Sequence, residues 1–276
     1  MSSSTTATPE GGAPPELLFV LSAISLYAGA ALAVSLFDAV SPLGVGWMRV
    51  LGGGLFLLPF SRRPPPGTWP AVAGFGLVLA CMNLCFYQAI ALIPMGTTVA
   101  IEFLGPIAVA LVASRSRQNL AAVALVTAGV FLLAGARKPD ELLGVGWGLL
   151  AATFWGLYIT AGHRLGRSLR TTDVVGPAML MGALLTGVVG GPAAVPAFLD
   201  LRLLLLCAAV GALSNAVPYW LDQYVLARVE PDRFAILLGL LPACAALLAW
   251  VTLGQRLGGA DWLGIVLVGA AVALKR

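Results

Sequence analysis

The sequence is poor in charge. Only 10% of its 276 residues are Asp, Glu, Lys or Arg, whereas 59% are hydrophobic and the mean hydropathy is +0.95. In soluble domains about a quarter of the residues are charged, and a water-soluble fold of this composition would have too few polar side chains to cover its surface. The composition therefore predicts an all-α polytopic membrane protein that is surrounded by the lipid bilayer.

Side chains with reactive chemistry are also scarce. The sequence has one histidine, His163, and no H-E-x-x-H segment, which excludes a His-rich zinc site. The four cysteines all lie within apolar runs and are not spaced like a disulfide framework. No paired aspartates and no activated Ser/His set stand out, so a membrane-embedded enzyme is the weaker alternative. We expect no catalytic residue, no metal ion and no cofactor.

Apolar runs long enough to cross a bilayer, which takes about 20 residues, recur along the chain. They follow residues 1–16, a polar tail that we expect to be disordered and that lacks the positive region of a signal peptide. The ten predicted spans are residues 17–37, 42–60, 69–91, 96–114, 119–136, 142–163, 172–195, 202–226, 232–253 and 258–274.

Basic residues divide unevenly between alternate links. If both termini and every second link lie on one side, that side holds eleven of the sixteen Lys and Arg residues. The other side holds four, and Arg49 lies within a span. The positive-inside rule then places both termini in the cytoplasm and the protein in the cytoplasmic (inner) membrane. Because the net charge of +4 comes from these links, we expect no nucleic-acid partner.

The two halves of the chain resemble each other. At an offset of 136 residues, 82–111 aligns with 218–247, and Pro106 falls on Pro242. Five spans per half is an odd number, so the sequence predicts two inverted five-helix repeats, residues 17–136 and 142–274, around a central cavity. Such repeats are typical of secondary transporters. A channel is disfavoured because no charged pore ring is evident.

Four segments carry a resemblance to a known family: "AGAALAVSLF", "MRVLGG", "MNLCFYQAIALIPMGTTVAIEFLGPIAVAL" and "VPYWLDQYVLARV". They are similar to the EamA-type branch of the drug/metabolite transporter superfamily, and within it to the threonine and homoserine exporters. Close relatives of that subgroup export aromatic amino acids and methionine. One departure is "LGQ", with Gln255, where the family has "LGE".

Three formal charges lie well inside the predicted spans: Arg49, Glu102 and Asp222. Intramembrane ionisable groups are rare and usually face protein or a water-filled cavity. On one predicted helix, Thr98, Glu102 and Gly105 share a polar or small face through their i, i+4, i+7 spacing. Two interpretations of Arg49 and Glu102 stay open: an ion pair that braces two helices, or a pair of groups that binds the two ends of a zwitterionic amino acid.

Polar aromatic and amide side chains in mid-span extend this candidate site. Each needs a hydrogen-bond partner because lipid offers none, so the alternative is that they only join helices. Pro106 and Pro242 are predicted hinges. Each of these prolines, like Pro218, lacks a backbone N–H and therefore leaves a carbonyl of the preceding turn without its helical donor. The predicted substrate-binding residues are Tyr27, Arg49, Asn83, Tyr87, Glu102, Trp155, Tyr158, Asn215 and Tyr219.

The resemblance and the predicted repeats together imply a secondary transporter that exports small amino acids or related metabolites by alternating access. Export would be driven by protons or by the substrate gradient. A transporter of drugs or other metabolites with the same fold is the alternative within the family.

Overall fold

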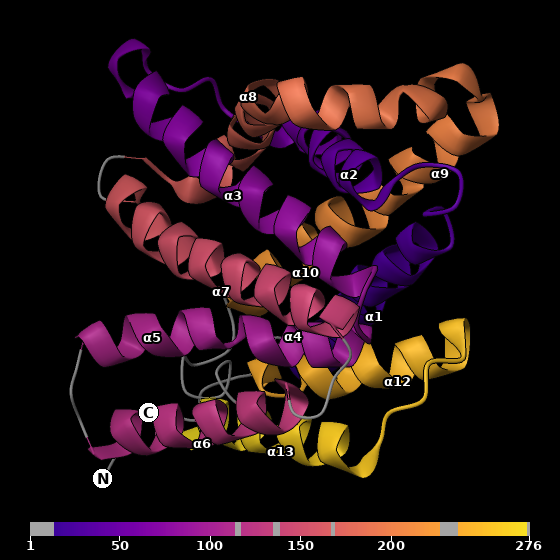
Figure 1. The fold of residues 1–276 in the computed structure, drawn as a ribbon. Helices are drawn as coiled ribbons and strands as arrows, with labels where there is room; N and C mark the ends of the chain where they lie inside the picture. Colours follow the sequence, from indigo (N-terminus) through magenta and orange to yellow (C-terminus); the bar gives the residue numbers. More distant parts are fainter. Residues whose placement is uncertain (1–13, 114–116, 135–138, 167–168, 227–236, 275–276) are drawn as a thin grey trace, which may run out of the picture.

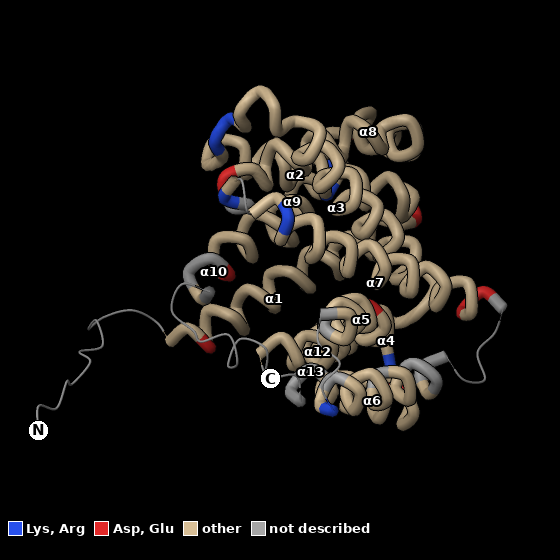
Figure 2. Tube along the Cα trace, turned by 90° about the vertical axis from the view of Figure 1, so that its left-hand side faces the viewer, with Lys and Arg blue, Asp and Glu red and all other residues tan. Residues whose placement is uncertain are grey.

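The computed structural model describes residues 14–113, 117–134, 139–166, 169–226 and 237–274, and all regular structure within them is helical (Figure 1). Most of the predicted tail and both chain ends lie outside these ranges, as do several of the basic residues that were counted for orientation. Charged residues are sparse along the described helices (Figure 2).

Helices occupy each of the ten predicted ranges. The first half contains α1 (Pro15–Val34), α2 (Pro42–Leu57), the short 3-10 helices η1 (Leu58–Phe60) and η2 (Pro66–Thr68), α3 (Trp69–Ile90), α4 (Met95–Glu102), α5 (Leu104–Ala113) and α6 (Arg117–Ala134). The second half contains α7 (Pro139–Leu165), α8 (Thr171–Leu199), α9 (Leu201–Gly211), the π-helix η3 (Ala212–Ala216), α10 (Val217–Leu226), α12 (Leu241–Leu253) and α13 (Gly259–Leu274).

Six of the described helical segments are long and apolar enough to cross a membrane. They contain α1, α2, α3, α7, α8 and the α9–η3–α10 unit, and the remaining apolar helices are shorter. The chain is thus an all-helical, polytopic membrane protein, as the composition predicted.

Polar caps and prolines fix where several helices begin. Pro42 opens α2, where a missing N–H costs nothing, and the Ser41 hydroxyl accepts a hydrogen bond from the Gly44 amide at 3.3 Å. Asp200 caps α9 by accepting from the Arg202 amide at 2.7 Å. At the other end of a helix, Gly254 follows α12 with a φ of 64°, which glycine adopts without steric cost.

The span predicted over 96–114 is helical, but the helix is not continuous. The helix is interrupted at Phe103, between α4 and α5. The cause is Pro106, which has no N–H to donate to the carbonyl four residues earlier, that of Glu102. In the second half of the chain, a turn at residues 239–240 separates the helical residues 237–238 from α12. This turn lies two residues before Pro242, as the interruption at Phe103 lies shortly before Pro106.

The helices pack in a small set of pairs. Contacts join α2 with α8, α4 with α12 and α6 with α13, and also α3 with α7, α1 with α10, α3 with α8 and α2 with α9. At the crossing of α3 and α8, Gly76 lies against the carbonyl of Ala178, and a Cβ at Gly76 would overlap it. The small residue thus lets two backbones meet, which is a common basis of helix association in membranes.

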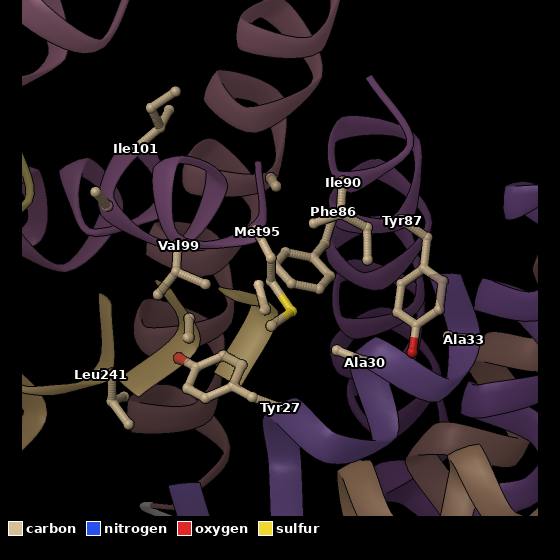
Figure 3. Packing of buried hydrophobic residues seen from close by; sticks show 14 of the residues in the cluster. Tyr27, Ala30, Ala33, Phe86, Tyr87, Ile90, Met95, Val99, Ile101 and Leu241 are labelled. Atoms are coloured by element: carbon tan, nitrogen blue, oxygen red, sulfur yellow. The ribbon is translucent and has the colours of Figure 1, made fainter. Parts of the chain in front are cut away.

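Buried apolar side chains form two clusters. The larger one includes residues of α1, α3, α4 and α12, some of which are drawn in Figure 3. The smaller one lies between α2, α3, α7 and α8 and includes Phe75, Leu79 and Val174. The polar residues described below lie where α1, α2, α3, α4 and η3 meet.

Helix α8 is unusually long, with 29 residues, and contains Pro177, Pro192 and Pro196 in its interior. Figure 1 shows it along the top of the molecule. Its outer face is apolar from Val188, which is 84% exposed, to Leu199 in the last turn, which is 81% exposed. This face is suited to lipid.

Candidate functional site

Arg49 lies on α2 and only 8% of its side chain is exposed. Its Nη2 atom donates a hydrogen bond to the backbone carbonyl of Ser214, at 3.2 Å. That carbonyl is available because the residue four positions later is Pro218, which has no N–H. The Ser214 carbonyl of the second half of the chain thus accepts a hydrogen bond from a buried cation of the first half.

Tyr87 and Asn215 also contact Arg49. The Arg49 guanidinium lies over the Tyr87 ring, 5.5 Å from its centroid, which is a cation–π distance. The Asn215 amide Nδ2 donates to the Arg49 carbonyl at 3.0 Å. Two polar atoms here, the Arg49 Nε and the Tyr87 hydroxyl, are buried and have no hydrogen-bond partner among the residues that the structure describes. This set of contacts fixes Arg49 and leaves part of its donor capacity unused.

Glu102 is the last residue of α4 and is 9% exposed. It makes no hydrogen bond and no ion pair with any described residue, although Arg49 is near enough for its charge to act on the carboxylate. The bracing ion pair that the sequence left open is therefore not formed in this conformation. Glu102 also has a backbone carbonyl freed by Pro106, and it sits at the negative end of a helix dipole. The Glu102 carboxylate, its free backbone carbonyl and the helix dipole all favour a cation at this position.

Tyr27 on α1 lies near both charges. Its side chain is buried, and it lies within electrostatic reach of Glu102, Arg49, Asp222 and Cys244. Figure 3 shows its ring below Met95 and Val99 of α4, with Leu241 of α12 beside it. Tyr27 is therefore placed between the broken helices of the two halves.

Short hydroxyl side chains complete the polar centre, and sequence reasoning missed them. The Ser22 hydroxyl donates to the Asp222 carboxylate at 2.6 Å, and the Ser25 hydroxyl donates to the Leu213 carbonyl of η3 at 2.8 Å. On α4, the Thr97 hydroxyl is buried, and no group in the described part of the chain is its hydrogen-bond partner. The signal was present, because Ser22, Ser25 and Gly29 share one face of the first span at helical spacing.

Of the other predicted site residues, Trp155 lies near Glu102, whereas Tyr158, Tyr219 and Asn83 pack elsewhere. Trp155 is close to the Glu102 region, since its ring packs edge-to-face on Phe103 with centroids 5.1 Å apart. Tyr158 instead stacks on Phe75 at 4.9 Å and, like Tyr219, packs against the smaller apolar cluster. Asn83 is buried on α3, and its amide donates to the Leu79 carbonyl of its own helix at 2.8 Å, so it acts within that helix.

Gln255 forms a contact between the halves near one end of the bundle. Its side-chain oxygen accepts a hydrogen bond from the backbone amide of Met95, the first residue of α4, at 3.1 Å. The amides in the first turn of a helix have no intrahelical acceptor, so Gln255 satisfies one of them. The residue that replaces the family's glutamate thus caps the helix that ends at Glu102.

Long apolar helices surround a buried centre that contains Arg49 and Glu102, and neither of these two residues forms an ion pair with a residue that the structure describes. This arrangement defines a multi-pass membrane protein with charged groups in its interior. Comparison with known proteins agrees with this class. The model of the EamA-like transporter family matches residues 142–275. The threonine/homoserine exporter RhtA of Salmonella typhimurium (strain SL1344) is 33% identical over 264 residues, which cover 93% of this chain and 89% of that protein.

RhtA of Escherichia coli (strain K12) is likewise 33% identical over 250 residues, or 88% of this chain and 84% of that protein. A protein crystal structure that is 21% identical covers 94% of both chains with a TM-score of 0.61, which shows the same fold. The chain belongs to the EamA-like transporter family. It is a multi-pass inner-membrane transporter rather than an enzyme, and the resemblance stated from sequence is confirmed.

Proposed function

We propose that the protein exports small zwitterionic amino acids, of the threonine and homoserine kind, by alternating access. The observation that carries this proposal is the pair of buried opposite charges that do not bind each other. Glu102 lacks any partner among the described residues, and Arg49 keeps one unpaired donor. An amino acid brings an ammonium group for the first charge and a carboxylate for the second.

The packing supports an inverted-repeat mechanism. If the two halves are exchanged, the contacts of α2 with α8, α4 with α12 and α6 with α13 map onto themselves. The contact of α3 with α7 maps onto that of α1 with α10, and the contact of α3 with α8 maps onto that of α2 with α9. Such an exchange is the symmetry of ten spans arranged as two five-helix repeats, in which rocking of one repeat against the other exposes a midplane site to each side in turn.

The two interrupted helices are the proposed hinges. Pro106 and Pro242 each leave one carbonyl without its helical donor, so bending there breaks no further hydrogen bond. Tyr27 lies between the two interruptions. We infer that substrate binding at Glu102 and Arg49 is coupled to bending at these prolines, and that a proton or the substrate gradient drives the cycle.

Purified protein in liposomes tests the proposal. We would measure counterflow of labelled threonine and homoserine, with aromatic amino acids, sugars, nucleotides and cationic drugs as competitors. Threonine or homoserine should exchange, and only zwitterionic amino acids should compete. Competition by cationic drugs but by no amino acid would replace the proposal with the drug-transporter alternative.

Glu102→Gln, Arg49→Gln and the double variant then test the site. Because Glu102 has no hydrogen-bond or ion-pair partner within the described ranges, Glu102→Gln should keep the melting temperature near that of the wild type, whereas breaking a buried ion pair costs about 3–5 kcal/mol. Counterflow should fall at least about tenfold, equivalent to about 1.4 kcal/mol of lost binding. Full counterflow by Glu102→Gln, with stability lost and then restored in the double variant, would make Glu102 a brace.

Orientation has its own test. The uneven distribution of basic residues predicts cytoplasmic termini, so reporter fusions at Ser2 and at Arg276 should both report the cytoplasm. A periplasmic signal from either end would contradict the ten-span inverted topology without bearing on the chemistry at Glu102.

A further inference from the structure

An open groove separates α5 from α7 on the outside of the bundle, away from the charged centre. Its volume is about 820 Å³, and its walls are mostly apolar, with Ala108, Val112, Leu149 and Leu157 among them. Several of these side chains are well exposed, including Val112 at 87%. The groove therefore opens towards the surroundings of the protein, which in a membrane are lipid chains.

The polar groups of the groove are not available along most of its length. The hydroxyls of Thr153 and Thr160 donate to the carbonyls of Leu149 and Leu157 in their own helix, at 2.9 Å each. A polar solute would find no free donor there, because these two hydroxyl protons are already used. The walls favour a hydrocarbon occupant.

One end of the groove is different, since His163 and Arg164 line it at the end of α7. Both side chains are exposed. The distribution of basic residues along the chain predicts that this end faces the cytoplasm, where basic pockets between membrane helices bind anionic lipid headgroups. The groove thus combines an apolar channel with a cationic end.

The dimensions agree with one lipid chain. From Leu149 to Arg164 the groove follows α7 for about 22 Å, at 1.5 Å per residue. One leaflet is half of a hydrocarbon core of about 30 Å, so a chain anchored at Arg164 would remain inside the groove for its whole depth. At the base of the groove, Gly105 lies against the Ala152 carbonyl, so α5 and α7 touch there and the occupant stays on the outer side.

We propose that the groove between α5 and α7 is a binding site for an anionic phospholipid, with one acyl chain along the groove and the headgroup phosphate on His163 and Arg164. The ligand class follows from charge complementarity at one end and apolar walls along the rest. The site is separate from the proposed amino-acid site, and its test does not depend on transport.

Native mass spectrometry of detergent-purified protein, titrated with phosphatidylglycerol or phosphatidylcholine of equal chain length, tests this site. Wild-type protein should retain phosphatidylglycerol preferentially. Arg164→Gln combined with His163→Gln should lower that affinity at least about fivefold, the effect of roughly one basic residue at a membrane surface, and should leave phosphatidylcholine binding unchanged. Arg170→Gln, an exposed arginine outside the groove, is the matched control.

A second variant tests the apolar part. Ala108→Phe fills the groove and should reduce retention of both lipids, whereas Ala270→Phe, at an exposed position on α13 outside the groove, should not. Equal retention of the two lipids by the wild type, or an unchanged preference in the Arg164 and His163 double variant, would overturn the headgroup assignment. Unchanged retention in Ala108→Phe would overturn the groove as the site.

Discussion

The helix that Pro106 interrupts and the helix that Pro242 interrupts occupy equivalent positions in the two halves of the chain, 136 residues apart. In each, the residue four positions before the proline loses the helical donor for its carbonyl. In the first half that residue is Glu102, and in the second half it is Leu238. Both halves therefore have a proline that leaves a carbonyl without its helical donor, but only the first half has a carboxylate at that position.

This difference separates two requirements of the proposed cycle. A hinge in both halves suits a scaffold in which each repeat must bend in turn, and proline provides it without regard to side-chain chemistry. A single small substrate, in contrast, has only one ammonium group, so a second buried carboxylate would cost about 2.5–3.5 kcal/mol by insertion scales and bind nothing. In the proposed cycle, the two prolines allow each half to bend, and the single carboxylate of Glu102 binds the substrate.

The largest expected effect comes from moving the carboxylate between the halves. Glu102→Leu should abolish counterflow, with a loss of at least about tenfold, and adding Leu238→Glu should not restore it, because Arg49 and Tyr87 remain beside the first position. Counterflow by the three proteins, with size-exclusion profiles to verify folding, is the measurement. Recovery in the double variant would show that the two interruptions are chemically interchangeable.

The next effect concerns Pro218. The carbonyl that lacks a helical donor because of this proline is that of Ser214, and it accepts a hydrogen bond from Arg49. Pro218→Ala supplies an amide that competes with Arg49 for the Ser214 carbonyl. We expect a loss of about 1.5–3 kcal/mol, the range for hydrogen bonds to charged groups, measured as a lower melting temperature in detergent. Arg49→Gln should make the Pro218→Ala substitution nearly neutral. A stability loss that persists in that background would mean that Pro218 acts through backbone shape alone.

Replacing each hinge proline compares the two halves directly. Pro106→Ala and Pro242→Ala both restore a donor, but only the first alters the carbonyl that belongs to Glu102. Counterflow should fall about fivefold for Pro106→Ala, equivalent to about 1 kcal/mol for one neutral hydrogen bond, and less for Pro242→Ala. If Pro242→Ala is the more damaging change, bending of the second half dominates the cycle.

The smallest effect is expected at Gln255, which joins the two halves through the Met95 amide. Gln255→Ala should cost about 0.5–1.5 kcal/mol, the net value of one hydrogen bond. Gln255→Glu should retain the wild-type melting temperature or raise it slightly, because an anion near the start of a helix is favourable. Thermal unfolding of the three proteins decides this, and equal stability of Gln255→Ala and wild type would show that the contact contributes nothing.

Much of the helix layout could be predicted from sequence because a bilayer leaves few options for an apolar run of sufficient length. The burial of Arg49 and Glu102 was also predictable, since a charge inside a span must face protein or water. The interruption at Phe103 was not placed, because proline inside a membrane helix can either bend it or end it. The neighbouring turn decides which of the two occurs.

The interaction partners of the buried polar side chains were harder to predict from sequence than the positions of these side chains along the chain. The acceptor of Arg49 is the Ser214 carbonyl in η3, and the neighbouring Leu213 carbonyl of the same π-helix accepts a hydrogen bond from Ser25 of another helix. Tyr158 looked equivalent to Trp155 in sequence, one turn away on the same helix, yet they pack in different clusters. Which cluster each ring joins is set by the crossing of α3 and α7, and spacing along one helix does not contain that information.

The length of α8 connects the protein to the thickness of its membrane. At 1.5 Å per residue, its 29 residues measure about 44 Å if straight, against a hydrocarbon core of about 30 Å. Its apolar face continues to Leu199, so tilting and bending at Pro192 and Pro196 must accommodate the excess. Because α8 packs on both α2, which carries Arg49, and α3, which carries Tyr87, a change of its tilt reaches the buried charges. If the proposed alternating-access cycle holds, bilayers of longer or shorter acyl chains should therefore shift the balance between its inward-open and outward-open states.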